Sequence, residues 1–234
     1  MSRLKLASYN IHQCVGLDGR RDVRRIAAVL REIDADVLCL QEVSTEPGLT
    51  SDSMQIQYLG AMLELHAVAG PTIVRGQGHY GNALLTRRPL LDVRHVDLTV
   101  YRREPRAAID VDLDGGAGPV RVIATHLGLL PGERRWQVRR LLDILDQDAY
   151  KPTVLCGDIN EWFAIGRPLR WLHARLGRVR GLPTFPAACP VFALDRAWVD
   201  PPSAVRGVRV HATAAAREAS DHLPVVVEIE VPAR

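Results

Sequence analysis

The sequence is poor in cysteine and in aromatic residues, and both scarcities narrow the possible protein classes. Its four cysteines are Cys14, Cys39, Cys156 and Cys189, and no two of them form a CxxC pair. This spacing argues against a disulfide framework and against a thiolate zinc site. Cys39 and Cys156 lie within apolar runs, which predicts that both are small buried thiols.

Long hydrophobic runs and internal repeats are also missing. No stretch approaches the roughly 20 uninterrupted apolar residues of a membrane span. The first six residues lack the apolar segment of a signal peptide, so we expect a cytoplasmic protein. A chain of 234 residues with 47% hydrophobic and 24% charged residues suits one large globular domain better than two. We therefore expect a single domain over residues 1–234.

Charge of one sign is not in large excess, because the formal net charge is +3. Nearly all of the basic charge is arginine, since Lys5 and Lys151 are the only lysines. The planar arginine fork suits phosphate recognition, but genomic base composition explains the bias equally well. There is no long basic run of the kind that a nucleic-acid track favours. Arg134 and Arg135 are expected on the exposed side of their helix, without a role.

Short apolar runs and amphipathic stretches alternate along the chain. Asp22 is a predicted N-cap, and further helices are expected around 52–65, after Gly132 and near 167–175. The glycine-rich stretch 115–119 predicts a hairpin, which argues against a purely parallel doubly wound sheet. The fold class is therefore a layered α/β domain. The predicted strands are Leu4–Tyr9, Asp36–Gln41, Ala83–Thr86, Val93–Val100, Ala107–Leu113, Val120–Thr125, Thr153–Gly157, 193–199 and 225–231.

Polar side chains stand where these strands end or begin. Strand ends can gather distant residues into one cleft. Singly, such residues are usually turn formers or surface groups. Together, their oxygen atoms suit the binding of a hard divalent cation, and the histidines remain available for proton transfer or for stabilising charge. The set comprises Asn10, Glu42, His126, Asp158, Asn160, Asp195, Asp221 and His222.

The same residues lie in motifs that resemble, in order, those of the endonuclease/exonuclease/phosphatase superfamily. The resemblance implies a four-layer sandwich of two packed mixed β-sheets flanked by helices, with the site at one edge. It also implies a Mg²⁺-dependent hydrolase of phosphoesters in which Mn²⁺ substitutes. We infer no obligate protein partner from the sequence. The motifs are YNIH (9–12), LQEV (40–43), GNALLTRRP (81–89), ATHL (124–127), GDINEW (157–162), LDRAWV (194–199) and SDHLPV (220–225).

The resemblance also implies roles for the metal and water ligands. Glu42 would be the principal metal carboxylate, with Asn10 and Asp221 as direct or water-mediated ligands. Asp158 would orient and deprotonate the attacking water, with Asn160 aligning the water or the phosphate. In-line attack builds negative charge on the phosphoryl oxygens, which a cation and aimed donors stabilise.

The histidines and arginines receive phosphate-directed roles from the same resemblance. His222, held in place by Asp195, would contact a non-bridging phosphoryl oxygen. His126 would be a second phosphate ligand or a general acid. Arg103 and Arg106 are candidate phosphate-binding arginines, and Arg106 is favoured slightly. Asn82 is a further candidate for lining the cleft.

Several alternatives stay open at this point. His126 stands where AP endonucleases usually carry asparagine, and no acidic residue follows Asn10 closely, so abasic-site repair is disfavoured. A nuclease and a phospholipid or sugar-phosphate phosphodiesterase both fit. The second would use an apolar rim from Trp162 and the 183–186 loop, although Trp162 is expected in the core. The other classes are a catalytically inactive binding module on the same fold and a structural protein whose strand-end polar residues are accidental.

Overall fold

Two mixed β-sheets form the centre of the molecule. The computed structural model describes residues 1–46, 53–147 and 151–232. Within them the first sheet has the order β10-β11-β1-β2-β4-β3 and the second the order β5-β6-β7-β8-β9. The strands are β1 (Ser2–Asn10), β2 (Val37–Thr45), β3 (His66–Arg75), β4 (Gly78–Thr86), β5 (Leu90–Asp97), β6 (Ala107–Asp114), β7 (Pro119–His126), β8 (Thr153–Asp158), β9 (Asp195–Asp200), β10 (Val205–Val210) and β11 (Val225–Val231).

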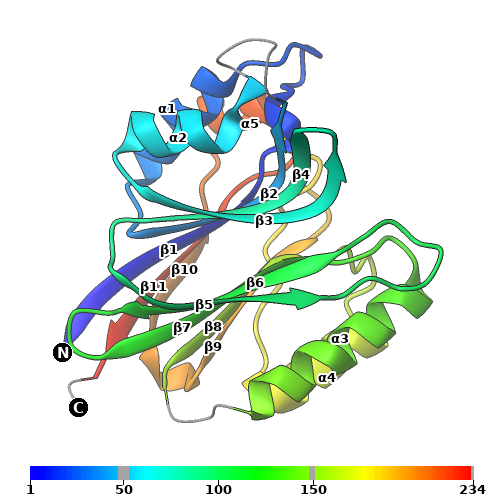
Figure 1. Cartoon of the computed structure of the whole chain (residues 1–234). Helices are drawn as coiled ribbons and strands as arrows, with labels where there is room; N and C mark the ends of the chain where they lie inside the picture. The colour runs from blue at the N-terminus through cyan, green and yellow to red at the C-terminus, as the bar shows by residue number, and fades with distance from the viewer. Residues whose placement is uncertain (47–52, 148–150, 233–234) are drawn as a thin grey trace.

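Helices cover the two outer faces, so the molecule has the expected four layers (Figure 1). α1 (Val23–Ile33), α2 (Gln55–Leu63) and α5 (Ala214–Ala219) lie on the first sheet, and α3 (Pro131–Asp146) and α4 (Arg167–Leu176) lie on the second. Three apolar clusters join neighbouring layers: one under each helical layer and one between the sheets. The described residues also contain two short 3-10 helices, His12–Cys14 and Pro202–Ala204.

The central strands explain why the sheets bury so much of the chain. β2 and β8 are buried on both faces, so their sequences are continuous apolar runs rather than alternating ones. Cys39 of β2 and Cys156 of β8 are buried between the sheets, as predicted, and their thiols are hydrogen-bonded. The parallel pairs β1–β2 and β7–β8 place the ends of these four strands at one edge of the sandwich.

Most predicted elements are present with shifted ends. The Asp22 side chain accepts from the Arg24 amide, as an N-cap does, and the 115–119 turn joins β6 to β7. The predictions missed β3 and β10, which lie at opposite edges of the first sheet and are largely exposed. The polar stretch predicted around residues 47–48, and residue 52 of the helix predicted at 52–65, lie outside the described residues. No helix in the described ranges is both long and apolar enough to span a membrane.

Candidate active site

Three of the predicted residues occupy neighbouring positions at one edge of the second sheet. His126 is the register partner of Asp158 in the parallel β7–β8 pair, and Asp158 is the partner of Asp195 in the antiparallel β8–β9 pair. Gly157 (φ 149°) precedes Asp158, and a Cβ there would lie 1.9 Å from the Thr125 carbonyl oxygen. Only glycine therefore permits the close approach of the two strands.

The first sheet supplies two more residues at the same edge. Asn10 ends β1, and Glu42 lies in β2 where the pairing with β4 shifts register between Leu40 and Val43. Such a bulge redirects side chains, and Glu42 itself has a left-handed backbone (φ 58°). Asn10 Nδ2 donates to Glu42 Oε1 at 2.9 Å and to Asp158 Oδ2 at 3.2 Å. This amide thus joins the two sheets.

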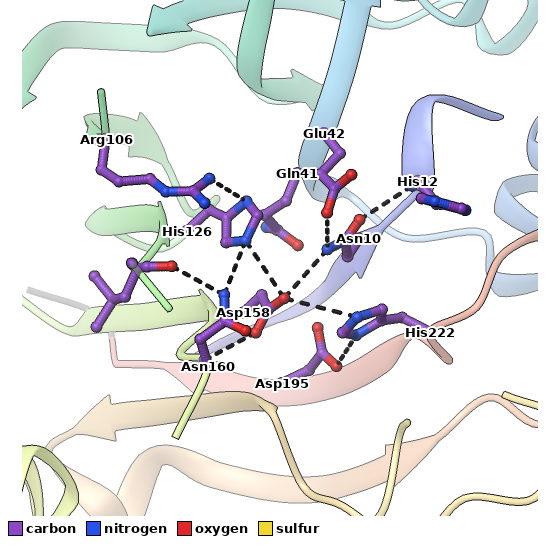
Figure 2. Close-up of polar contacts among 12 residues, drawn as sticks. Asn10, His12, Gln41, Glu42, Arg106, His126, Asp158, Asn160, Asp195 and His222 are labelled. Atoms are coloured by element: carbon purple, nitrogen blue, oxygen red, sulfur yellow. Dashed lines mark hydrogen bonds and ion pairs between the residues drawn. The ribbon is translucent and has the colours of Figure 1, made fainter. Parts of the chain in front are cut away.

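Asp158 is the centre of the resulting network (Figure 2). Its Oδ1 accepts from the Asn160 backbone amide at 2.9 Å. Its Oδ2 lies 3.5 Å from His126 Nε2 and 3.8 Å from His222 Nε2. Asn160 also has a left-handed backbone (φ 53°), which is uncommon for a residue other than glycine. One buried carboxylate is therefore surrounded by groups from four separate segments.

His222 is held from its other side by Asp195. His222 Nδ1 donates to Asp195 Oδ2 at 2.8 Å, and the Thr184 hydroxyl donates to the same oxygen at 2.6 Å. All three residues are buried. The Asp195 contact fixes the ring so that Nε2 faces Asp158. Thr184 was not predicted as part of the site, because its only link to Asp195 is a contact across the loop that precedes β9.

His126 is oriented by an arginine rather than by an acid. Arg106 Nη1 donates to His126 Nδ1 at 3.2 Å, so the ring proton belongs on Nε2. Asn160 Nδ2 lies 3.1 Å from that Nε2 and donates to the Leu127 carbonyl at 2.9 Å. Arg106 is only 6% exposed and also pairs with Glu104 at 3.3 Å.

The two histidines are driven to opposite charge states. Burial, with Arg106 and His222 nearby, holds the pKa of His126 well below its usual range, so this ring is neutral. Burial alone would lower the pKa of His222, but Asp195, Asp158 and Asp221 raise it to about 10. Burial, followed by repulsion from Asp195, raises the pKa of Asp158 to about 7. The site therefore contains a cationic His222 and a neutral His126 at neutral pH.

Three predicted residues stand apart from this network. Asp221 is half-buried beside His222, with Oδ1 3.8 Å from His12 Nδ1. Arg103 is exposed in the turn before β6, where its backbone amide donates to the Val100 carbonyl at 2.9 Å. Asn82 is buried, but its Nδ2 donates to the Ala107 carbonyl at 2.9 Å, which links β4 to β6. Of the two candidate arginines, Arg106 is the one in contact with the site.

Two sequence-based expectations for residues next to the predicted site are wrong. Arg134 is not exposed: only 1% of it is accessible, and its Nε lies 3.2 Å from Glu161 Oε2. Its helix turns this position inward because Glu161, from the loop after β8, supplies a buried partner. Trp162 is not in the core but 40% exposed, where its ring packs edge-on against Phe185 and Phe192. Phe185 in turn lies 4.8 Å, ring to ring, from His222.

The oxygen donors at this edge suit a hard divalent cation. Glu42 and Asp158 approach the same Asn10 amide, and carboxylate and amide oxygens are the ligands that Mg²⁺ prefers. A second arrangement groups Asp158, Asp195 and His222, with ligand atoms within 4.8 Å of one another. In that group Asp195 Oδ2 already accepts from Thr184 and His222, so the Glu42 side is the better fit.

Comparison with known proteins agrees with this geometry. A profile of the Endonuclease/Exonuclease/phosphatase family matches residues 7–222. The chain is 28% identical to the uncharacterized protein YbhP of Escherichia coli K12 over 97% of this chain and 96% of that protein.

Solved structures give the same result for the fold. An endonuclease/exonuclease/phosphatase from Beutenbergia cavernae is 26% identical, with a TM-score of 0.81 over 99% of this chain and 72% of that one. The human Nocturnin catalytic domain with bound sulfate is 20% identical, with a TM-score of 0.71 over 99% of this chain and 94% of that one. With the family profile spanning nearly all of its length, the chain belongs to the endonuclease/exonuclease/phosphatase family.

Proposed function

We propose that the protein is a divalent-metal-dependent hydrolase that cleaves a phosphoester, most readily a phosphodiester, by in-line attack of water. The observation that carries this proposal is the convergence on Asp158 of Asn10 from the first sheet and of Asn160, His126 and His222 from the second half of the chain. A buried carboxylate surrounded by N–H donors is suited to hold a water and accept its proton while the donors hold a phosphoryl group.

In the reaction, Asp158 takes a proton from the attacking water as the water oxygen bonds to phosphorus and the ester P–O bond breaks, and the released alkoxide takes up a proton from solvent. The negative charge that develops on the non-bridging oxygens is met by the cationic His222 and by the Nε2–H of the neutral His126. Asp195 positions His222, and Arg106 positions His126. With its proton held on Nε2 and its pKa low, His126 is better suited to donate a hydrogen bond than to protonate the leaving group.

Glu42, Asn10 and Asp221 would hold the metal, Mg²⁺ or Mn²⁺. When bound, the ion would supply positive charge that lowers the energy of the developing oxyanion. Glu42 supplies a carboxylate to this set, and its Oε1 accepts from Asn10 Nδ2 at 2.9 Å. Asp221 is half-buried, and its Oδ1 lies 3.8 Å from His12 Nδ1.

The test is hydrolysis of a substrate panel with Mg²⁺ or Mn²⁺. The panel contains single- and double-stranded DNA, RNA, sphingomyelin, phosphatidylinositol phosphates and bis-p-nitrophenyl phosphate. We expect turnover of at least one ester by the wild type and loss of that turnover in Asp158→Asn. Asp143→Asn, an exposed residue of α3, is the matched control. A folded wild type that binds phosphate esters but hydrolyses none would instead support the inactive binding module.

A further inference from the structure

An arginine-rich groove lies beside the candidate active site on the second sheet. It has a volume of about 960 Å³ and lies between α4, the loop after β8 and the loop before β9. Four arginines line it, Arg170, Arg178, Arg180 and Arg196, against a single acid, Glu161. A concave surface with this excess of one sign concentrates ions of the opposite sign.

Arg196 is the unusual member of this groove. It is 7% exposed, yet it has no hydrogen bond or ion pair with any residue in the described part of the chain, and its buried Nε is unsatisfied. Glu161 attracts it electrostatically, but that carboxylate is already paired with Arg134 at 3.2 Å. Arg134, Glu161 and Arg196 together therefore carry one net positive charge. Unpaired buried charges are costly, so proteins normally match them with an anion.

The other arginines of the groove are exposed and do not explain why Arg196 is buried. Arg94 and Arg121 are instead neutralised within the protein, because both form ion pairs with Asp110. Burial lowers the pKa of Arg196, but a guanidinium stays protonated in proteins. The loop before β9 also approaches closely, because a Cβ on Gly181 would lie 2.6 Å from Arg196 Nη1. The guanidinium is thus held against the groove wall without an internal partner.

Aromatic contacts connect the groove with the candidate active site. Arg196 directly follows Asp195, which holds His222, and Trp162 lies two residues after Asn160. Trp162 and Phe192 line the groove, and their rings lie 4.9 Å apart. Trp162 also contacts Phe185, which packs on His222. A ligand bound at the candidate active site could therefore extend along these rings into the groove.

We propose that Arg196 is the centre of a second anion subsite, which binds a phosphate group of the substrate other than the one that is cleaved. The choice of phosphate rests on the proposed function, whereas the existence of an anion subsite rests on Arg196 itself. The planar guanidinium offers paired N–H donors that match phosphate oxygens. Trp162 and Phe192 would pack against the part of the substrate that joins the two phosphates.

The test measures binding without turnover, by titration calorimetry in EDTA. The ligands are inorganic phosphate and thymidine 3′,5′-bisphosphate, and acetate at equal ionic strength controls for a general salt effect. We expect Arg196→Met to weaken the bisphosphate by on the order of tenfold to a hundredfold, the effect of losing a charge-assisted hydrogen bond. Arg196→Lys keeps the positive charge but lacks the planar guanidinium, so its affinity for the bisphosphate should lie between those of the wild type and Arg196→Met.

The control variant is Arg206→Met, which removes the same charge from an exposed residue paired with Glu230. It should leave the dissociation constants unchanged. Ligand-free Arg196→Met should melt at the wild-type temperature or above it, because it removes an unpaired buried charge.

Three results would overturn the proposal: equal binding by Arg196→Met and wild type, acetate binding as strongly as phosphate, or a loss confined to inorganic phosphate. If the protein binds the bisphosphate through Arg196 but hydrolyses no substrate, only the proposed function is refuted.

Discussion

Asp195 and His222 provide the sharpest test of the proposed chemistry, because one acts only through the other. His222 Nδ1 donates to Asp195 Oδ2 at 2.8 Å, and both residues are at least 95% buried. A hydrogen bond to a charged group is worth about 1.5–3 kcal/mol. Asp195→Asn should therefore lower kcat/KM by about 10- to 150-fold. His222→Ala, which removes the donor to the phosphoryl oxygen, should cost about 10²–10³-fold.

The double variant decides whether the two residues form one unit. If Asp195 works by orienting and charging His222, the double variant should match His222→Ala within about threefold, because groups that act together are not additive. The assay is kcat/KM of the two single variants and the double variant on any substrate that the wild type hydrolyses. Asp200→Asn, at the other end of β9, is the control. Losses that multiply would refute the positioning role, and a folded, fully active His222→Ala would refute the mechanism.

Three further predictions concern the metal and the fold. Activity should vanish in EDTA and return with Mg²⁺ or Mn²⁺, and full activity in metal-free buffer would contradict the proposed cofactor. Glu42→Gln should raise the Mg²⁺ concentration for half-maximal activity by about tenfold or more, because losing even a residue that hydrogen-bonds a metal ligand lowers metal affinity by that factor. An unchanged Mg²⁺ requirement would exclude Glu42 as the principal ligand. Burial would raise the pKa of Asp110, but Arg121 and Arg94 hold that pKa below its usual range. The Asp110 ion pairs therefore add to the free energy of unfolding above about pH 4, and this contribution is lost as the pH falls. Asp110→Asn should cost about 3–5 kcal/mol at pH 7 and about 1 kcal/mol less at pH 3 in urea unfolding, and an equal cost at both would be inconsistent with the ion pairs.

The site was largely predictable because its residues sit at the ends of recognisable apolar runs. Asn10, His126 and Asp158 directly end strands whose sequences are buried on both sides, so their position at one edge follows from the local pattern. The resemblance supplied the two-sheet arrangement that brings Asn10 to Asp158. The pattern failed where a distant partner decides the orientation of a side chain.

Arg134 and Thr184 illustrate that failure. Helical periodicity alone placed Arg134 in solvent, but a buried Glu161 from another segment draws it inward. Thr184 lies in a loop whose path is set by contacts with Phe192 and Leu223, so nothing local indicates that its hydroxyl reaches Asp195. β3 and β10 were missed for a related reason, because an exposed edge strand lacks a strong apolar pattern.

The bridge from Asn10 to Asp158 has a consequence for how the protein is made. Asn10 ends the first strand, yet its amide contacts a residue synthesised 148 positions later, and the Ser220 hydroxyl closes on its carbonyl from 210 positions away. β1 lies between β2 and β11, so β1 cannot complete its pairing until β11 has been made. A chain that ends before Ser220 lacks both His222 and this partner strand. The proposed chemistry would therefore begin as a single late event once these last residues are in place.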